Sequence, residues 1–499
     1  MDNRRCVVIG SGLGGLSCGL ILAKNGWKVT ILEKNSQIGG CLQCFSRRGV
    51  KFETGMHFIG SADKGQTLSR LFHYLDLHDR IDLSRLDTDG YNVISLAGSR
   101  FRIPNGREPF IERMSEYFPK STDNLVAYFD LIERIAEASS LHSLRYAESD
   151  MAVSTEYQMR SMDDVLREVV SDRDLRQVLA GNLPLYAAEY GKTPFSIHAF
   201  ITEFYSQSSF RIVGGSDHIG HALVDSIRRH GGDVLTDKKV VHIDCGERLA
   251  HGVETSDGTY YPADLVISGV HPCRMLEMLD TGLIRPAFRQ RINSIANTTS
   301  GFAVYLHFKE GRMPYMNSNY YGYRSGTPWN CEKYSQENWP KGYLYMHFCH
   351  QQNPATAGSG VLLSYMNMAD VAAWRDTKVG HRGADYEAFK RQKAELLIDV
   401  AERDFPGLRD SIANYYTSTP LTYRDYTGTQ DGSMYGILKD VGLGAGSRIP
   451  QRTKIPNLLL TGQNINSHGI LGVLVGAIVT CSEVVSAEKI YQQIVEANR

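Results

Sequence analysis

The chain has no excess of charge of either sign. Its 499 residues include 54 lysines and arginines against 55 aspartates and glutamates, and no run of six like charges occurs. Nucleic acid is therefore not expected as a partner, because it requires a basic footprint on the protein surface. The sequence also contains no internal repeat and no low-complexity segment, which argues against a repeat protein.

Long hydrophobic runs are missing as well. The longest apolar run, residues 470–479, is too short to span a bilayer and is typical of a buried helix. Residues 1–5 lead directly into a predicted strand, so we expect no cleavable signal segment. We expect a cytoplasmic protein, and peripheral contact with a membrane is left open.

Cysteine is sparse and scattered over nine positions, and Cys41 and Cys44 form the one C-x-x-C pair. No second pair and no cluster of cysteine and histidine lies near them, so we expect no structural zinc site and no other metal. Two interpretations of the pair remain. It is either a redox dithiol or two small buried residues near a cofactor, and the second is favoured.

Most of the chemical information lies near the N-terminus. A predicted strand at 6–9 runs into the glycine-rich turn 10–15, which is followed by a helical pattern. A second predicted strand at 28–32 ends at Glu33. This order of strand, G-x-G-x-x-G turn, helix, strand and acid is typical of a dinucleotide-binding site.

Each position of this motif has a physical task. Gly10 permits the tight turn, Gly12 lets the backbone approach a pyrophosphate, and Gly15 lets the helix pack closely on the strand. The helix N-terminus offers free N–H groups and a positive dipole end to the phosphates. Glu33 can accept hydrogen bonds from ribose hydroxyls.

A second pair of glycines, Gly39 and Gly40, lies just past the acid. This pair is similar to the second pyrophosphate contact of the glutathione-reductase-like flavoproteins, whereas NAD dehydrogenases usually carry no such pair there. The sequence therefore predicts FAD as the cofactor.

The predicted fold class is α/β, with a glutathione-reductase-like FAD-binding Rossmann domain and a second, mixed α+β substrate domain. Alternating strands and helices assign the discontinuous FAD-binding domain to residues 1–60, 210–272 and 451–499. The substrate or cap domain is predicted at 61–209 and 273–450, with an antiparallel sheet and helices.

The second predicted domain is rich in aromatic residues, with ten between Tyr315 and Phe348. Two interpretations are equally open. These side chains form a core with some surface tyrosines, or they line a pocket for a long apolar ligand.

Several segments together resemble a known family. They are Val7–Gly15, Glu33–Lys34, Gly39–Cys41, Phe52–Gly60, Thr419–Thr422 with Gly436, and Asn457–Ala477. The chain resembles the phytoene desaturase-like flavoproteins, a branch of the amine-oxidase superfamily. Within that branch it is most similar to the retinol saturase group (all-trans-retinol 13,14-reductase-like) and its carotene isomerase relatives. Cys41 replaces the arginine of many desaturases, and Asn464 replaces the aspartate of many saturases.

The resemblance and the glycine motif together imply a set of FAD-binding residues. The helix that opens at Gly469 is expected to point its positive N-terminal end at the N1/O2 edge of the flavin. The predicted FAD-binding residues are Gly10, Gly12, Leu13, Gly14, Gly15, Glu33, Lys34, Gly39, Gly40, Cys41, Gly55, Met56, His57, Val240, Val241, Gly462, Gln463, Asn464, Gly469, Leu471, Gly472 and Val473.

The resemblance implies a flavin-dependent oxidoreductase that acts on carbon–carbon double bonds of a lipophilic polyene or isoprenoid, foremost a saturase. Saturation needs a proton as well as a hydride, and we consider His57, His468 and Tyr435 as its donors. A carotenoid desaturase, a cis–trans isomerase and an amine oxidase are the alternative enzymes. A non-catalytic escort protein for prenyl lipids, which shares this plan, is the alternative of another class.

No second complete dinucleotide motif is present. The glycines between Gly442 and Gly446 lack a preceding strand and a following helix. We therefore expect electrons from an external donor, or from NAD(P)H that binds transiently at the flavin.

Overall fold

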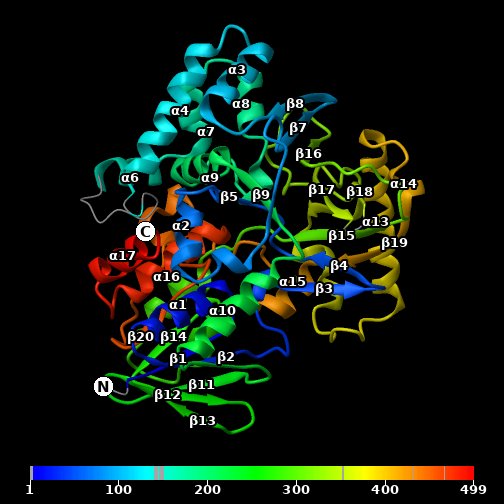
Figure 1. Ribbon diagram of the computed structural model, residues 1–499. Coiled ribbons are helices and arrows are strands. Elements are labelled where there is room, and N and C mark those ends of the chain that lie inside the picture. The colour runs from blue at the N-terminus through cyan, green and yellow to red at the C-terminus, as the bar shows by residue number, and fades with distance from the viewer. Residues whose placement is uncertain (1–3, 140–143, 145–150, 351–352, 430, 466) are drawn as a thin grey trace.

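The computed structural model describes residues 4–139, 144, 151–350, 353–429, 431–465 and 467–499. Two sheets organise the chain (Figure 1). The first is a five-stranded parallel sheet in the order β10-β2-β1-β14-β20. Its strands are β1 (Arg5–Ile9), β2 (Lys28–Leu32), β10 (Asp233–Leu235), β14 (Leu265–Ser268) and β20 (Leu458–Leu460).

The parallel sheet is the buried centre of this half of the molecule. Val8 is fully buried and lies opposite Ile31 on one side and Ile267 on the other. Helices α1 (Leu13–Lys24), α10 (Asp217–Arg229) and α16 (Gly469–Cys481) cover the face of the sheet that carries Val8, and α1 contacts both of the others. The opposite face, which carries Val7 and Ile9, packs against a second, smaller sheet.

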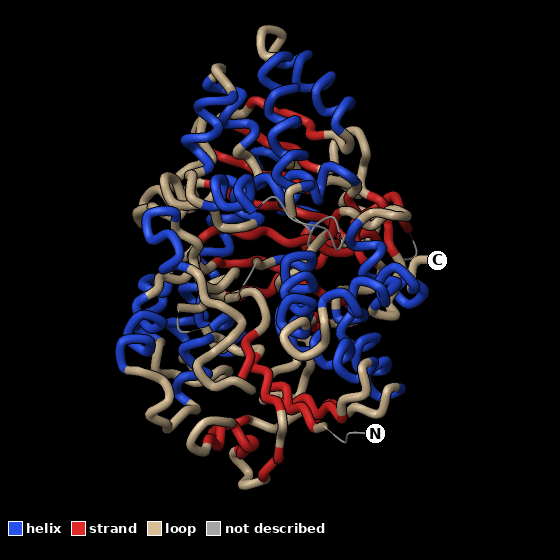
Figure 2. Tube along the Cα trace, turned by 90° about the vertical axis from the view of Figure 1, so that its left-hand side faces the viewer, coloured by secondary structure: helices blue, strands red, loops and turns tan. Residues whose placement is uncertain are grey.

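A small antiparallel sheet completes this half at the lower end of Figures 1 and 2. It consists of β11 (Val240–Cys245), β12 (Ala250–Thr255) and β13 (Tyr260–Pro262). A tight turn around Asp257 and Gly258 joins β12 to β13.

The second large sheet has seven strands in the order β19-β15-β18-β17-β16-β7-β8. All its pairs are antiparallel except β16 with β7, so the sheet is mixed where the sequence predicted an antiparallel one. Its strands are β7 (Asn92–Leu96), β8 (Ser99–Ile103), β15 (Gly301–Phe308), β16 (Asn319–Tyr323), β17 (Gly342–His350), β18 (Asn353–Tyr365) and β19 (Ile412–Ser418).

The β16–β7 pair joins two distant parts of the chain. Strand β7 precedes helices α3–α9 in the sequence, whereas β16 follows them and comes after β15. Both parts fall within the segments that we predicted as the substrate domain. The domain boundaries themselves remain a prediction.

Helices gather at the upper end of the molecule and along one side of the seven-stranded sheet (Figures 1 and 2). The remaining helices are α2 (Thr67–Tyr74), α3 (Arg107–Tyr117), α4 (Thr122–Glu137), α6 (Met151–Gln158), α7 (Met162–Val169), α8 (Arg173–Leu179), α9 (Phe195–Gln207), α11 (Pro272–Glu277), α12 (Pro286–Ser294), α13 (Ala384–Asp404), α14 (Leu408–Ser411), α15 (Pro420–Thr427) and α17 (Ala487–Glu496). Short strands β3 (Cys44–Arg47) with β4 (Val50–Glu53), and β5 (Ile59–Gly60) with β6 (Leu83–Arg85) and β9 (Ser209–Ile212), link the two halves.

The tyrosines of the seven-stranded sheet are core residues. Tyr320 and Tyr345 pack edge-on against Phe405 with ring centroids 4.8 Å away, on the side of the sheet covered by α13. Tyr321 and Tyr323 belong to the core on the other side, as the alternation of a strand requires. The structure therefore favours the core interpretation of the aromatic segment.

Close contact between α1 and β1 depends on glycine at two positions. Gly10 has φ of +94°, which disfavours any other residue. A Cβ atom on Gly15 would lie 2.1 Å from the carbonyl oxygen of Gly10. The glycine turn and α1 can therefore pack this closely against β1 only because residues 10 and 15 have no side chain.

Glu53 ties β4 to the start of α10. Its buried carboxylate accepts hydrogen bonds from the backbone N–H of Ser216, at 3.0 Å, and from the Ser216 hydroxyl. The oxygen of the same hydroxyl lies 3.1 Å from the carbonyl oxygen of Leu42. Burial raises the pKa of Glu53 to about 7, although the Ser216 donors act in the opposite direction. This tie fixes the segment after β4, which reaches the site described below.

We expect Gly15→Ala to destabilise the fold by about 1–3 kcal/mol or more, because backbone atoms of Gly10 would have to move. The free energy of unfolding in denaturant measures the effect. Gly282→Ala is the matched control, since a Cβ there meets no atom within 4 Å and the φ of Gly282 is not positive. Equal stabilities of the two variants would contradict this packing.

Glu53 should make stability depend on pH. Its folded pKa lies above the ordinary value of 4.5, so the unfolded chain releases the proton first as the pH rises. The free energy of unfolding should therefore fall between pH 4.5 and about 7, by up to about 3 kcal/mol relative to Glu53→Gln. Denaturant titrations of both proteins across this range test it. If the free energy of unfolding of the wild type, relative to that of Glu53→Gln, stays constant or grows with pH, the hydrogen bonds from Ser216 outweigh the effect of burial on the pKa of Glu53.

Candidate cofactor and substrate site

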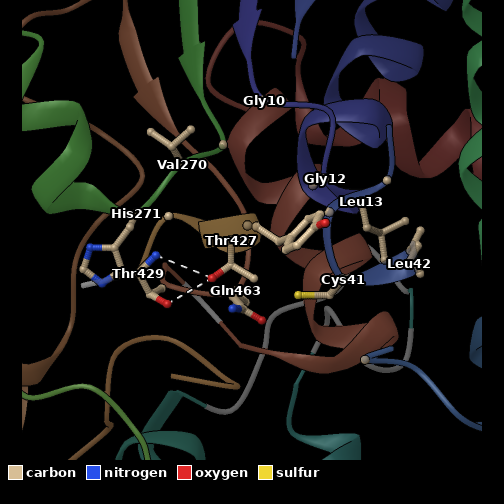
Figure 3. A pocket seen from close by; sticks show the side chains of 18 of the residues that line it. Gly10, Gly12, Leu13, Cys41, Leu42, Val270, His271, Thr427, Thr429 and Gln463 are labelled. Carbon is tan, nitrogen blue, oxygen red and sulfur yellow. Dashed lines mark hydrogen bonds between the residues drawn. The ribbon is translucent and has the colours of Figure 1, made fainter. Parts of the chain in front are cut away.

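A cavity of about 790 Å³ is lined by residues from both large sheets. Its outer end lies at the glycine turn after β1, and its inner end reaches β17 and β18 through Leu344 and Leu363. Figure 3 shows the glycine turn and the side chains around it. A volume of this size lies in the range of small-molecule and cofactor sites.

The outer end is built from backbone. Gly10, Gly12 and Gly14 line the cavity on one side, and Gly39 and Gly40 line it beside them. A Cβ atom on Gly12 would meet nothing within 4 Å, so the turn leaves open space in front of the α1 N-terminus. A helix N-terminus with exposed backbone before it is suited to a phosphate group.

Glu33 is the carboxylate of this end. It is buried, and it accepts hydrogen bonds from the Ser11 N–H at 2.9 Å, the Ser11 hydroxyl at 2.7 Å and the Asn35 N–H at 2.9 Å. These donors fix its orientation at the end of β2. A carboxylate has about four acceptor sites, so Glu33 can still accept a bond from a ligand hydroxyl.

The outer rim carries several cationic side chains. Lys34 donates to the carbonyl oxygen of Asp425 at 2.9 Å, and Arg274 donates to the carbonyl oxygen of Gly428 at 3.0 Å. Both bonds bring the end of α15 over the outer cavity. Burial lowers the pKa of Lys34. Thr427 and Thr429 flank Gly428, and their hydroxyls lie 3.0 Å apart (Figure 3).

The C-terminal segment forms the middle of the cavity wall. Gly462, Gln463 and Asn464 follow β20, and Gly469 opens α16 with φ of +74°. The side-chain oxygen of Asn464 accepts a hydrogen bond from the backbone N–H of Ile437 at 3.1 Å. In this arrangement Asn464 holds a neighbouring loop as well as lining the cavity.

The inner end is apolar. Its wall combines residues from the segment after β4 with residues from β17, β18, α9 and α15. These lining residues are Cys41, Met56, His57, Phe58, Leu185, Tyr205, Leu344, Leu363, Tyr423, Met434 and Tyr435.

Most residues that the sequence pointed to lie on this one cavity. None of the ten aromatic residues between Tyr315 and Phe348 lines it. Gly15, His468, Leu471 and Gly472 also lie outside the lining, and Gly15 and Gly472 instead face close packing contacts. The predicted residues that line it are Gly10, Gly12, Leu13, Gly14, Glu33, Lys34, Gly39, Gly40, Cys41, Gly55, Met56, His57, Val240, Val241, Tyr435, Gly462, Gln463, Asn464, Gly469 and Val473.

His57 and His468 are both uncharged in the folded protein. Burial lowers the pKa of His57 to about 3, with the nearby Arg211 acting in the same direction. Burial lowers the pKa of His468 to about 4, and Lys439 adds to this effect. A neutral imidazole is a weak acid at neutral pH, so this state works against the proton-donor role considered for either histidine.

Tyr435 keeps its proton. Burial raises the pKa of its hydroxyl, which donates a hydrogen bond to the carbonyl oxygen of Pro184 at 3.0 Å. Its ring lies 4.9 Å from that of His468. Among the three candidates it is the one that lines the cavity and carries a proton on oxygen at neutral pH.

Two buried cations near the cavity were not predicted. Arg211 is 4% exposed, and Lys439 donates to the carbonyl oxygens of Asn464 and Ile465 at 3.1 and 3.2 Å. Burial lowers the pKa of Lys439 to about 8. The signal was present in the sequence, because each cation directly follows or interrupts an apolar segment, Phe210–Val213 or Ile437–Leu438.

The two cysteines of the C-x-x-C pair have different surroundings. Cys41 lines the cavity (Figure 3), whereas the Cys44 thiol lies 3.7 Å from Glu53 and 3.6 Å from the Ser216 hydroxyl. Burial raises the pKa of both thiols, that of Cys44 to about 12. A redox dithiol needs an accessible thiolate, so the structure favours small packing residues.

The cavity fits an FAD dinucleotide. Its outer end combines the N-terminus of α1, the glycine turn, the glycine pair Gly39–Gly40 and the oriented carboxylate of Glu33. These groups suit a pyrophosphate and a ribose. The start of α16 lines the middle, where a flavin ring would meet a positive helix end. Within the described residues, no group of three metal-ligating side chains occurs. None of the described helices has both the length and the apolar character needed to cross a membrane.

Comparison with known proteins agrees with this geometry. The chain is 27% identical to the all-trans-retinol 13,14-reductase of Rattus norvegicus, over 98% of this chain and 86% of that protein. It is 23% identical to the chloroplastic prolycopene isomerase 1 of an Oncidium hybrid cultivar, over 94% of this chain and 78% of that protein. Both matches confirm the resemblance that the sequence motifs indicated.

A solved structure shares the fold. An oxidoreductase from Methanosarcina mazei superposes with a TM-score of 0.64 at 16% identity, over 95% of this chain and 99% of that one. This similarity confirms the α/β class with a Rossmann-type domain and a second, mixed domain. The family model for flavin containing amine oxidoreductases matches residues 13–480. Since this pattern spans nearly the whole sequence, the chain belongs to the flavin containing amine oxidoreductases and takes a flavin as its cofactor.

Proposed function

We propose that the protein is an FAD-dependent reductase that saturates a conjugated carbon–carbon double bond of a lipophilic polyene or isoprenoid. The observation that carries this proposal is the division of the cavity. Its outer end fits a dinucleotide, and its inner end is apolar and built from the second sheet. The relatives named for a retinol reductase and a prolycopene isomerase support polyenes as the substrate class.

The charges around the cavity disfavour an amine substrate. The acidic side chains among the described lining residues are Glu33, Glu277 and Asp425, and they lie at the outer end. Lys439 lies behind the middle of the cavity, where it bonds to the carbonyl oxygen of Asn464, and the buried cation Arg211 lies behind the inner end, bonded to the carbonyl oxygen of His57. An ammonium group placed there would lose its hydration without gaining a carboxylate partner.

Bound FAD supplies two-electron redox chemistry. The protein's own residues hold the substrate in an apolar enclosure that excludes water, with Leu344 and Leu363 forming one wall. A proton must also reach the substrate. We propose that it comes from the Tyr435 hydroxyl or from a water beside it, because both histidines are neutral.

Two related reactions use the same enclosure. Desaturation is the reverse reaction, and cis–trans isomerisation needs the same substrate position, so the cavity's shape alone favours none of the three. We propose saturation because the relative with 27% identity is named a reductase. A non-catalytic lipid escort is disfavoured, because the glycine turn, Glu33 and the second glycine pair all line an open cavity.

The source of electrons is part of the proposal. Val441–Ser447, which holds the remaining glycine-rich segment, forms a short 3-10 helix that follows no strand. We propose an external electron donor, or NAD(P)H that binds transiently at the flavin. A cytoplasmic location with peripheral membrane contact, where lipophilic substrates partition, also remains a proposal.

Gly12→Val should remove the cofactor without disturbing the fold. The backbone of Gly12 is extended, with φ of −64° and ψ of 167°, and a Cβ there meets no atom within 4 Å. The added side chain would project into the space that we assign to the pyrophosphate. We expect a protein that purifies colourless and unfolds like the flavin-free wild type. A variant that keeps a full complement of flavin would contradict the assignment.

The proposed reaction can be observed in one anaerobic experiment. The flavin is reduced in the purified protein, all-trans-retinol is added, and the absorption spectrum is recorded. We expect the absorbance of oxidised flavin to return while the polyene band shifts to shorter wavelength. A flavin that stays reduced while the polyene changes geometry would identify an isomerase. No spectral change in either would contradict the choice of substrate or of reaction direction.

A further inference from the structure

Polar atoms without partners gather around the inner end of the cavity. His57 lines the cavity, and its ring Nδ1 is buried with no hydrogen-bond partner in the described part of the chain. The hydroxyl of Tyr321 and the Nε of Arg211 are also buried and have no hydrogen-bond partner among the described residues. Burying a polar atom without a hydrogen-bond partner is unfavourable, so several such atoms in one place point to a ligand that completes them.

Arg211 connects these groups. Its guanidinium donates to the carbonyl oxygen of His57 at 3.1 Å and to the side-chain oxygen of Asn319 at 3.0 Å. It also donates to the carbonyl oxygen of Ser318 at 3.1 Å. These acceptors are carbonyl and amide oxygens, and none of them is a carboxylate. Burial lowers the pKa of Arg211, while Tyr315 and Glu53 act in the opposite direction. The cluster therefore has a buried positive charge that lacks an acidic partner.

Tyr321 faces the cavity side of the seven-stranded sheet. It lies directly opposite Leu344 in the β16–β17 ladder, and Leu344 lies opposite Leu363 in the next ladder. Residues directly opposite one another in a ladder project to the same face. Since Leu344 and Leu363 line the cavity, the Tyr321 side chain lies beside this wall. Tyr320, its neighbour, projects to the opposite face.

We propose that the inner end binds the oxygen-bearing end of the substrate, a hydroxyl or a carboxylate, through His57 with Tyr321 beside it. This inference rests on the proposed function and names the end group of the polyene. A neutral imidazole and a phenol both hydrogen-bond to oxygen. The charge of Arg211 favours a carboxylate over a hydroxyl and opposes an ammonium group. The end group held at residue 57 would bring the adjacent double bond to the segment Gly55–His57, which we predict to contact the flavin.

The test titrates four ligands into the oxidised holoenzyme and follows the flavin spectrum. The ligands are all-trans-retinoate, all-trans-retinol, the deoxy analogue that carries a methyl group in place of the oxygen end, and all-trans-retinylamine. We expect affinity to fall in this order, with retinoate at least about tenfold tighter than retinylamine. Equal affinities for all four ligands would overturn the inference and leave the proposed function standing. If no ligand perturbs the flavin, both fail.

Two substitutions locate the contacts. His57→Leu should raise the Kd of retinol and retinoate about tenfold and leave the deoxy analogue unchanged, while His57→Gln should recover part of the loss. Tyr321→Phe should weaken the same two ligands. Tyr320→Phe is its matched control, because that hydroxyl is also buried and makes no hydrogen bond within the described residues, but it lies on the far face of the sheet.

The flavin content of each variant separates ligand binding from cofactor binding. We expect Tyr321→Phe to retain flavin at the wild-type level. The ligand affinities of His57→Leu are measured on its flavin-loaded fraction, because residue 57 is also predicted to contact the cofactor. A His57→Leu protein that loses flavin would show that the free nitrogen serves the cofactor, and would overturn the inference. Tyr320→Phe and Tyr321→Phe with the same ligand affinities would overturn the part assigned to Tyr321.

Discussion

The close approach of α1 to the end of β1 is the contact on which the rest of the site depends. The absence of a side chain on Gly15 lets α1 lie against the backbone at the end of β1. On another side of the same helix, a Cβ on Gly14 would lie 2.9 Å from the backbone of Gly462. The glycine turn and the C-terminal segment are therefore packed against each other at the same helix. Because Gly462–Asn464 and the start of α16 line the middle of the cavity, the position of α1 sets the position of both walls.

The electrostatic character of the cavity changes along its length. Glu33, Lys34 and Arg274 give the outer end charged groups that suit a dinucleotide. The inner end has no acid on its described wall, and Arg211 lies buried behind it. This change agrees with the proposed lipophilic substrate, because the described wall of the inner end offers no acid to pair with an ammonium group.

Much of the fold and the cofactor end of the site could be predicted from the sequence, because their signals are local. A strand, a glycine turn and Glu33 follow one another within a short segment, and their spacing alone fixes their relation. The inner end could not be predicted in the same way. Leu185, Leu344 and Leu363 meet only after distant segments of the chain come together. The tyrosines that suggested a pocket are core residues on both faces of the sheet, and none of them lines the cavity.

An equilibrium titration of the flavin-free protein with FAD and with FMN tests the central claim most directly. The residues of the outer end would hold the adenosine part of FAD, which FMN lacks. The account therefore predicts that FAD binds at least about 100-fold more tightly than FMN, with riboflavin no better than FMN. Comparable affinities for FAD and FMN would show that the glycine turn and Glu33 do not hold the cofactor, and would contradict the account.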